Sequence, residues 1–463
     1  MRKSPILTLL VLVAASFPLA AADAPYLRRG TPRREGRFWS ELDACVVPVK
    51  SGGHLIVRTD LGTVTVVPGA DPDRLQCEVK LLAFTPSDAE ARSFFSRAML
   101  AARRTPPDGA SLELRFPGRD PIASRVAVFF SIQVPRHFNL DVQTQSGTIQ
   151  VCGLDGDLRA LTAGGDIRSG DLTGSVRAET GGGNITLGSI GQRLDARSGG
   201  GSIRIGDVKG DAYLDSTGGD IVAGMIAGSV HAQTAAGDIV LRGAQGPVMV
   251  ETDGGQIQLG QCGSSVRAQS LAGSIHLDGA RGRVQAETGG GSIDLLQVMS
   301  AVQAETSAGN ILAQLDAGRD AFSASTLRST MGDVHVFVPS DLPLTVNALI
   351  QTGIGHVIAS DFPLTMHRQN PGDLGLGVVQ GVGTVSGGGP QLTLRTNLGN
   401  IEIRKEDAQS MARVKAYQLL FWRNWQEQQK EQEQSLELLR QVMQEQQQHL
   451  DELQRMLSDN GQQ

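Results

Sequence analysis

Ten glycines recur every 18 residues without a single insertion, and this period constrains the fold more than any other feature of the chain. An Ile follows each glycine by two positions, and a Ser or Thr precedes each by three. The glycines are Gly147, Gly165, Gly183, Gly201, Gly219, Gly237, Gly255, Gly273, Gly291 and Gly309. A fixed period of this length indicates stacked units that bury their apolar faces against one another.

Each unit alternates apolar and polar residues with the period of a β-strand. Val176 and Ala178 alternate before one glycine turn, Ile185 and Leu187 alternate after it, and Ile190 begins a third apolar patch. Glycine is too frequent for helix, and there is no 3.6-residue spacing. We therefore predict an all-β protein, a single parallel β-solenoid with 18-residue coils about 4.8 Å apart. The pattern leaves its handedness and oligomeric state open.

Two columns occupy the predicted corners. We assign the glycines there to backbone with positive φ, which glycine adopts without steric cost. The Ser or Thr of each repeat lies an even number of residues from the inward aliphatic residues of the same strand, so its side chain also points inward. These residues predict an interior ladder of hydroxyl groups that bond to backbone or to neighbouring coils.

The repeat template also fits outside the regular run, around Gly62, Gly332, Gly355 and Gly399, with loops inserted between the later coils. The solenoid is therefore expected from about residue 45 to residue 405. The predicted organisation is a signal peptide (1–22), a linker (23–44), N-terminal strands with a capping helix (45–136), the regular solenoid (137–315), irregular C-terminal coils (316–405) and a Gln/Glu-rich helix (406–463).

The helical insertion begins at a capping-box pattern, Ser87 to Glu90. Helical spacing continues to Ala102, before the turn signal at Pro106. We interpret this helix as a cap over the open end of the solenoid; a separate binding domain is the alternative.

The N-terminus predicts export. Arg2 and Lys3 precede an apolar run from Ile6 to Phe17, and Ala20 to Ala22 supply a small-residue cleavage pattern. The mature chain is expected to be periplasmic or extracellular in a bacterium, without a transmembrane segment. The formal charge of −6 for the full sequence and the lack of a basic run in the solenoid argue against nucleic acid as a partner.

Four cysteines are present. An oxidising compartment would permit a Cys45–Cys77 disulfide, which the sequence leaves open. Cys152 and Cys262 lie about six coils apart and are too distant to pair. Cys262 falls in an inward aliphatic column, where it acts as a small hydrophobic residue.

The tail differs from the rest in composition. Residues 406–459 lack Gly and Pro, and six apolar residues follow heptad spacing. These are Leu436, Leu439, Met443, Leu450, Leu453 and Leu457. We predict a helix with a short coiled-coil seam, used either for self-association through 406–459, for docking a partner, or folded back as a cap on the solenoid.

We find no catalytic, cofactor-binding or metal-binding constellation. Histidines are scattered, and the Asp turns beside the glycines do not match calcium-binding nonapeptide repeats. Glu287 and Glu305 lie on adjacent coils and come nearest to a catalytic carboxylate pair. A solvated acidic face explains them better, so we expect no enzyme.

Two segments carry a family resemblance. Residues 131–135 followed by 140–149, and again residues 360–364 and 387–392, resemble the putative-adhesin family of bacterial β-strand repeat proteins. The resemblance spans about residues 45–405, implies an envelope-associated β-solenoid and brings no catalytic residues. We expect an exported, non-enzymatic scaffold or adhesin-like protein that binds a glycan or an envelope protein. The alternatives are a polysaccharide-active β-helix and an envelope-stress sensor.

Overall fold

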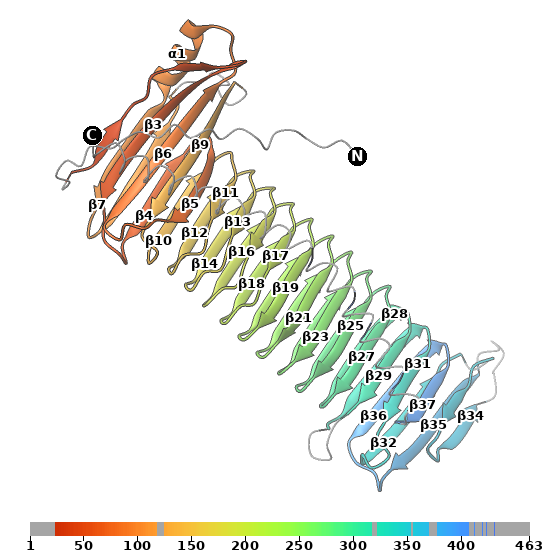
Figure 1. The fold of residues 1–463 in the computed structure, drawn as a ribbon. Coiled ribbons are helices and arrows are strands. Elements are labelled where there is room, and N and C mark those ends of the chain that lie inside the picture. Colours follow the sequence, from red (N-terminus) through yellow and green to blue (C-terminus); the bar gives the residue numbers. More distant parts are fainter. Residues whose placement is uncertain are drawn as a thin grey trace.

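The chain forms one rod of stacked coils (Figure 1). This computed structural model describes residues 24–117, 125–316, 322–352, 355–369 and 377–406, together with residues 412, 419, 423 and 430. Its strands form a 19-stranded sheet, here sheet A, and an 18-stranded sheet, here sheet B. This confirms the predicted all-β solenoid.

Sheet A runs along one side of the rod. Its strands are β1 (Tyr26–Arg28), β2 (Arg33–Glu35), β3 (Phe38–Pro48), β5 (Thr63–Pro68), β6 (Arg74–Ala83), β9 (Val126–Val134), β11 (Ile149–Val151), β13 (Ile167–Ser169), β15 (Ile185–Leu187), β17 (Ile203–Ile205), β19 (Ile221–Ile226), β21 (Ile239–Ala244), β23 (Ile257–Cys262), β25 (Ile275–Ala280), β27 (Ile293–Val298), β29 (Ile311–Leu315), β31 (Val334–Val338), β33 (Ile358–Ser360) and β37 (Ile401–Lys405).

Sheet B runs along another side. Its strands are β4 (His54–Thr59), β7 (Met99–Thr105), β8 (Gly109–Arg115), β10 (Asn139–Thr144), β12 (Leu158–Thr162), β14 (Val176–Thr180), β16 (Leu194–Ser198), β18 (Ala212–Ser216), β20 (Val230–Thr234), β22 (Val248–Thr252), β24 (Val266–Ser270), β26 (Val284–Thr288), β28 (Val302–Ala308), β30 (Ser325–Met331), β32 (Leu344–Ile350), β34 (Thr365–Gln369), β35 (Val378–Val385) and β36 (Gln391–Leu398).

In the middle of the rod every strand pairs in parallel with the strand one period later. Leu158 lies beside Val176 in sheet B, and Ile167 lies beside Ile185 in sheet A. A third side is closed by single bridges such as Leu172 to Ile190. The inward columns of these strands are almost free of solvent exposure and join one continuous core along the rod.

The glycine column has a different cause from the one predicted. Most of its members do not have φ in the left-handed region; among the template glycines that the structure describes, Gly62, Gly147, Gly332, Gly355 and Gly399 do. Instead each glycine of the regular run, and likewise Gly332 and Gly399, lies directly over the corner glycine of the coil on which it stacks. A Cβ at Gly183, for example, would fall well inside contact distance of the carbonyl oxygen of Gly165. Glycine is required because two backbones approach closely, and the prediction of positive φ was wrong for most of the column.

The hydroxyl ladder is present as predicted. Thr180 Oγ1 donates to the Gly165 carbonyl at 2.8 Å and accepts from the Gly183 N–H at 3.0 Å. Ser216 makes the same two bonds, to the Gly201 carbonyl at 3.0 Å and from the N–H three residues later at 3.0 Å. Each side chain thus ties its own corner to the coil before it.

The N-terminal end departs from sequence order. The coil of β4 and β5 lies between β8 and β9 on one side and β10 and β11 on the other. Beyond β9, sheet A continues through antiparallel strands β6 and β3, and β1 and β2 both pair with β3. Residues 23–44 are therefore not a linker as predicted, because residues 26–28, 33–35 and 38–44 form strands at the sheet edge.

The predicted helix is shorter than its spacing suggested. Helix α1 (Asp88–Arg97) begins with Ser87 accepting from the Glu90 N–H, as the capping box predicts. It ends at Arg97, and β7 follows in antiparallel pairing with β8. Leu100 is buried there while Met99 is exposed, so alternation prevails over helical spacing. Helix α1 packs on β6 and β3, and its buried side belongs to the common core (Figure 1).

The C-terminal end is rearranged in the same manner. The last strands in sequence, β36 and β37, lie between β30 and β32 in sheet B and between β31 and β33 in sheet A. Antiparallel strands β35 and β34 then close sheet B. The coil around Gly399 therefore stacks on the coil around Gly332, and the later position in sequence does not place it at the tip of the rod.

The cysteines divide into a bonded pair and two free thiols. Cys45 and Cys77 face each other across β3 and β6 and form a disulfide with a Cα–Cα distance of 5.0 Å. Cys152 and Cys262 are free and buried, and burial raises the pKa of each thiol to about 12. Cys262 packs in the inward column between Ala244 and Ala280, as expected of a small apolar residue.

The predicted signal peptide (1–22) and most of the predicted helix (406–463) lie outside the described residues. Among the described residues, no helix is both long and apolar enough to span a bilayer.

Candidate functional site on the outer face of sheet B

The strands of sheet B present two outward columns, which together we call face B. Strand alternation sends these side chains away from the core. The first column reads Ile56, Asp141, Arg159, Arg177, Asp195, Tyr213, His231, Met249, Arg267, Gln285 and Gln303. The second reads Arg58, Gln143, Leu161, Glu179, Arg197, Asp215, Gln233, Glu251, Gln269, Glu287 and Glu305.

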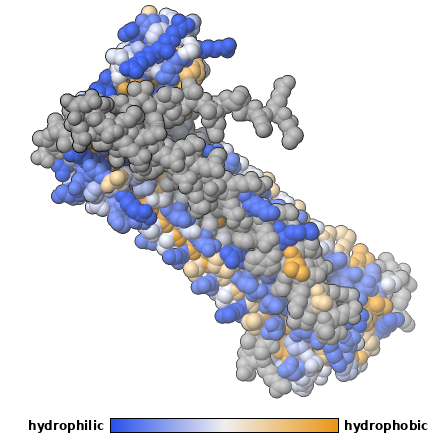
Figure 2. All heavy atoms as spheres, viewed as in Figure 1, coloured by the Kyte–Doolittle hydropathy of each residue, from blue (hydrophilic) through white to orange (hydrophobic). Residues whose placement is uncertain are grey.

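Opposite charges pair along the first coils of face B. Asp141 Oδ2 lies 2.7 Å from Arg58 Nη2 and 3.7 Å from Arg159 Nη1. Arg177 pairs with Glu179 at 2.6 Å on the same strand. Such exposed pairs add little stability, but they leave a surface rich in hydrogen-bonding groups without a large excess of either charge. Hydrophilic residues make up much of the coloured surface along the rod in Figure 2.

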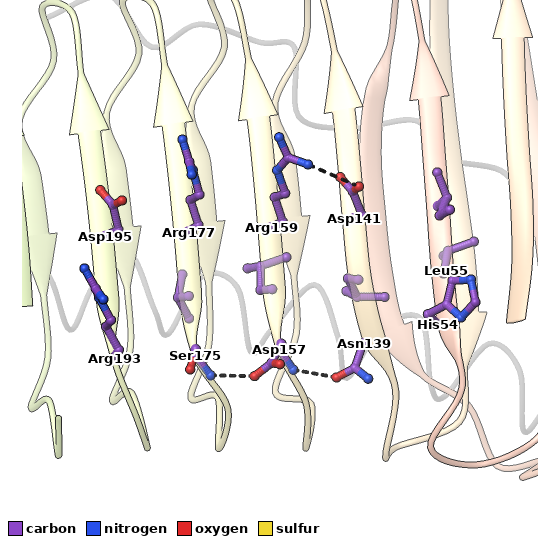
Figure 3. A pocket seen from close by; sticks show the side chains of 14 residues that line it. His54, Leu55, Asn139, Asp141, Asp157, Arg159, Ser175, Arg177, Arg193 and Asp195 are labelled. Atoms are coloured by element: carbon purple, nitrogen blue, oxygen red, sulfur yellow. Dashed lines mark hydrogen bonds and ion pairs between the residues drawn. The ribbon is translucent and has the colours of Figure 1, made fainter. Parts of the chain in front are cut away.

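A groove of about 490 Å³ lies on this part of face B. Arginines and aspartates from adjacent coils project along it (Figure 3). Its edge is fixed by a ladder in which Asn139 Oδ1 accepts from the Asp157 N–H at 2.9 Å and Asp157 Oδ1 accepts from the Ser175 N–H at 2.8 Å. The lining residues are His54, Leu55, Ile56, Asn139, Leu140, Asp141, Asp157, Leu158, Arg159, Ser175, Val176, Arg177, Arg193 and Asp195.

An aromatic platform continues the groove. Tyr213 lies beside Asp195 in the register of β16 and β18, and it stacks on His231 with ring centroids 5.0 Å apart and planes 18° apart. The Arg197 guanidinium lies over the Tyr213 ring, 4.9 Å from its centroid. Tyr213 is thus held between His231 on one ring face and the Arg197 guanidinium over the other, and the pair presents partly exposed ring edges bordered by charged hydrogen-bonding groups. Apolar ring edges with polar groups beside them suit a ligand that has one apolar side and several polar groups.

The carboxylates considered as a catalytic pair lie on adjacent strands, but their hydrogen-bond and ion-pair partners do not suit an acid–base pair. Glu287 and Glu305 are neighbours in register. However, Glu287 accepts hydrogen bonds from Gln285 at 2.7 Å and Gln269 at 2.8 Å, and these bonds hold its pKa below the usual range. Glu305 lies 3.6 Å from Arg328. A glycosidase acid needs a raised pKa, so the environment of Glu287 favours a permanently ionised surface group.

The Asp and Asn residues that follow the corner glycines accept hydrogen bonds from backbone N–H groups of the next coil. Asp220 Oδ1 accepts from the Asp238 N–H at 3.0 Å, and Asp238 Oδ1 accepts from the Gln256 N–H at 2.7 Å. Equivalent bonds are made by Asp166 and Asn184. Within the described residues no cluster of three or more His, Cys, Asp or Glu side chains could hold a metal ion.

Tyr213 and His231 were missed by the sequence analysis, although the necessary signal was present. Reading the outward column of Arg177 one period at a time places Tyr213 next to His231. A tyrosine in an outward column is conspicuous in a chain with only 3 Tyr and 3 Trp.

No protein-family model and no curated protein matches the chain. Solved structures similar to it include a putative cell adhesion protein from Clostridium sporogenes (8% identity, covering 81% of this chain and 100% of that chain, TM-score 0.14). Others are a putative adhesin from Bacteroides fragilis (9%, 79% and 97%, TM-score 0.20) and a putative lipid binding protein from Parabacteroides distasonis (9%, 83% and 98%, TM-score 0.17). At these TM-scores the likeness carries no argument, and function has to be argued from the residues of this chain.

Proposed function

We propose that the protein is an exported, non-enzymatic binding rod that holds a neutral polysaccharide along face B. The observation that carries this proposal is the stacked pair of Tyr213 and His231, which continues the polar groove from one coil to the next. A sugar ring has an apolar face of C–H groups and a rim of hydroxyls. The exposed edges of the stacked rings offer an apolar contact for the first, and the Asp, Arg and Gln side chains around them match the second.

The repeat itself favours a polymer. Equivalent outward positions return at every coil, about 4.8 Å apart, so an extended ligand can meet similar partners along the rod. The charges that line the groove favour an uncharged chain, because its three arginines and three aspartates leave no excess of one sign to neutralise an ionic polymer.

Two observations support an exported and non-catalytic role. The buried Cys45–Cys77 disulfide is typical of oxidising compartments outside the cytosol. The carboxylate of Glu287 is held ionised by two amide groups, which suits a binding surface better than a proton donor.

The test is affinity electrophoresis of the full mature chain against a panel of neutral and acidic polysaccharides. Tyr213→Ala should weaken binding about five- to tenfold, because an aromatic contact contributes about 1 kcal/mol. Gln303→Ala changes the same outward column at a distance from the platform and should bind as the parent does. Equal binding by Tyr213→Ala and the parent would overturn the proposed site.

A reducing-end assay on the same panel tests the alternative activity. We expect no release of reducing ends. Release that is lost in Glu287→Gln would replace the binding role by a polysaccharide-active one.

A further inference from the structure

The outer face of sheet A contrasts with face B because several of its outward side chains are buried. Val222 and Val240 alternate with the core residues Ile221 and Ile239, so they point out of the coil, yet each is only 2% exposed. They form an apolar cluster of their own, separate from the core. We call the outward side chains of sheet A from β19 to β31 face A.

Burial on face A extends toward the C-terminal end of the rod. Leu296 and Gln314 are also outward by alternation, and they are 0% and 1% exposed. Every strand that the structure describes belongs to sheet A or sheet B, and α1 packs on β6 and β3 at the other end. The described strands and α1 therefore provide no second layer over face A, and its cover has to come from elsewhere.

The chain itself turns toward face A after its last strand, β37. After β37 the Glu406 N–H donates to the Val338 carbonyl at 3.1 Å. The Glu406 carboxylate then accepts a hydrogen bond from Gln314, one of the buried outward residues. The tail thus starts in contact with face A.

The described residues of the tail are helical and share one exposed side. Ala412, Leu419, Arg423 and Lys430 are all in helical conformation and exposed, and Leu419 is 70% exposed. Their spacings of seven, four and seven residues place them in one stripe of a helix with 3.6 residues per turn. These residues mark the solvent side.

The sequence places the apolar residues opposite that stripe. A helix continued in the same phase carries nine large apolar side chains about half a turn away. They are Tyr417, Phe421, Trp425, Leu436, Leu439, Met443, Leu450, Leu453 and Leu457.

Length and direction agree with a lengthwise position. Residues 406–459 would form a helix about 80 Å long, whereas the strand stack from β37 to β11 spans roughly 53 Å. The distance from β37 to β21 is about 29 Å, or about 19 helical residues, which brings Trp425 near Val240.

We infer that residues 406–459 form an amphipathic helix docked lengthwise on face A, with Trp425 against Val222 and Val240. The helix then covers the apolar side of the rod and leaves face B open. It is neither a free coiled-coil arm nor a plug on the tip of the solenoid.

Fluorescence quenching of a single tryptophan tests the inference. In a full-length Trp39→Phe/Trp422→Phe background, Trp425 is the sole tryptophan. We expect acrylamide to quench it poorly, and the additional change Val222→Asp/Val240→Asp to raise the quenching constant several-fold. Gln233→Asp adds the same charge to an exposed position on face B of the same part of the rod, and it should leave quenching unchanged.

A tail-side variant separates undocking from misfolding of the solenoid. Phe421→Asp leaves every described strand intact and should release the helix to the same extent, seen as quenching of Trp425 and as faster proteolysis after residue 406. Poor protection of Trp425 in the parent would overturn the inference. So would protection that disappears on dilution together with a dimer in light scattering, since a second copy would then be the cover.

Discussion

The regular middle of the rod and its two ends use the same corner chemistry but different chain order. In the middle, each coil stacks on the coil that precedes it in sequence. At the N-terminal end the coil of β4 and β5 is overlaid by β8 and β9, which come later. At the C-terminal end β36 and β37 pair with β32 and β33, which come earlier in the sequence but lie nearer the tip of the rod.

The difference shows how the two ends of a parallel solenoid can be protected against the addition of further strands from another copy. A parallel coil leaves an open edge that another copy could extend. At the C-terminal end sheet A stops at the short parallel strand β33, whereas sheet B gains the antiparallel strands β35 and β34; at the N-terminal end both sheets gain antiparallel strands, β6 with β3 and β7 with β8. The antiparallel strands lack the corner glycines, so they offer no template for a further coil.

The largest effect is expected from a charge in the core of the middle. Ile221→Asp places an unpaired carboxylate in a column that is fully buried on both sides, which should cost about 4 kcal/mol or more. Hydrogen exchange should show loss of protection in several neighbouring coils, because each coil is stabilised by the next. Ile358→Asp in β33 is the control at the end of the rod, since Ile358 is only half-buried; equal loss in both variants would contradict the distinction.

Two adjacent glycines test the corner. Gly183→Ala would force a methyl group against the Gly165 backbone and should lower the free energy of unfolding by about 1–3 kcal/mol. Gly182→Ala meets nothing within 4 Å and does not have positive φ, so it should be neutral or stabilise by about 0.5 kcal/mol. Chemical denaturation measures both, and a similar loss in the two variants would mean that close backbone approach is not the reason for the column.

The N-terminal end should respond to pH through Glu41. Burial, with a smaller contribution from neighbouring Asp43, raises the pKa of Glu41 from 4.5 to about 7. The folded state therefore holds a proton that the unfolded state releases, and stability should fall as pH rises from about 4.5 to about 7. Arg29 and Arg92 oppose this shift without cancelling it.

Thermal unfolding at a series of pH values measures the effect. Glu41→Gln should flatten the dependence between pH 5 and pH 8. Glu287→Gln is the control in the middle, because the pKa of Glu287 is lowered and its contribution is lost only at more acidic pH. A slope that survives in Glu41→Gln would assign the dependence to another group, with Asp43, whose pKa is also raised by burial, as the next to test.

The middle could be predicted from sequence because one period carries all the necessary information. Ile185 two residues after Gly183 and Thr180 three residues before it specify strand, corner and register at once. The ends could not, because the template around Gly399 identifies a coil without saying which coil lies above it. The order is set by long-range strand pairing, as between Ile401 and Val334. The pair of Tyr213 and His231 could have been predicted by aligning the 18-residue repeats, whereas the burial of Val222 could be seen only in the structure.

The smallest effect is expected at the Asp turns, and it separates two explanations of these residues. If Asp220 serves only to accept the Asp238 N–H, then Asp220→Asn keeps an oxygen in the same place and should change stability by less than about 0.5 kcal/mol. Asp220→Ala removes the acceptor and should cost about 1 kcal/mol.

If the turns bound calcium instead, the parent would melt at a higher temperature with calcium than with a chelator, and Asp220→Asn would reduce that difference. We expect identical melting with and without calcium, because the carboxylate oxygens of successive turns are already engaged by the backbone of the next coil.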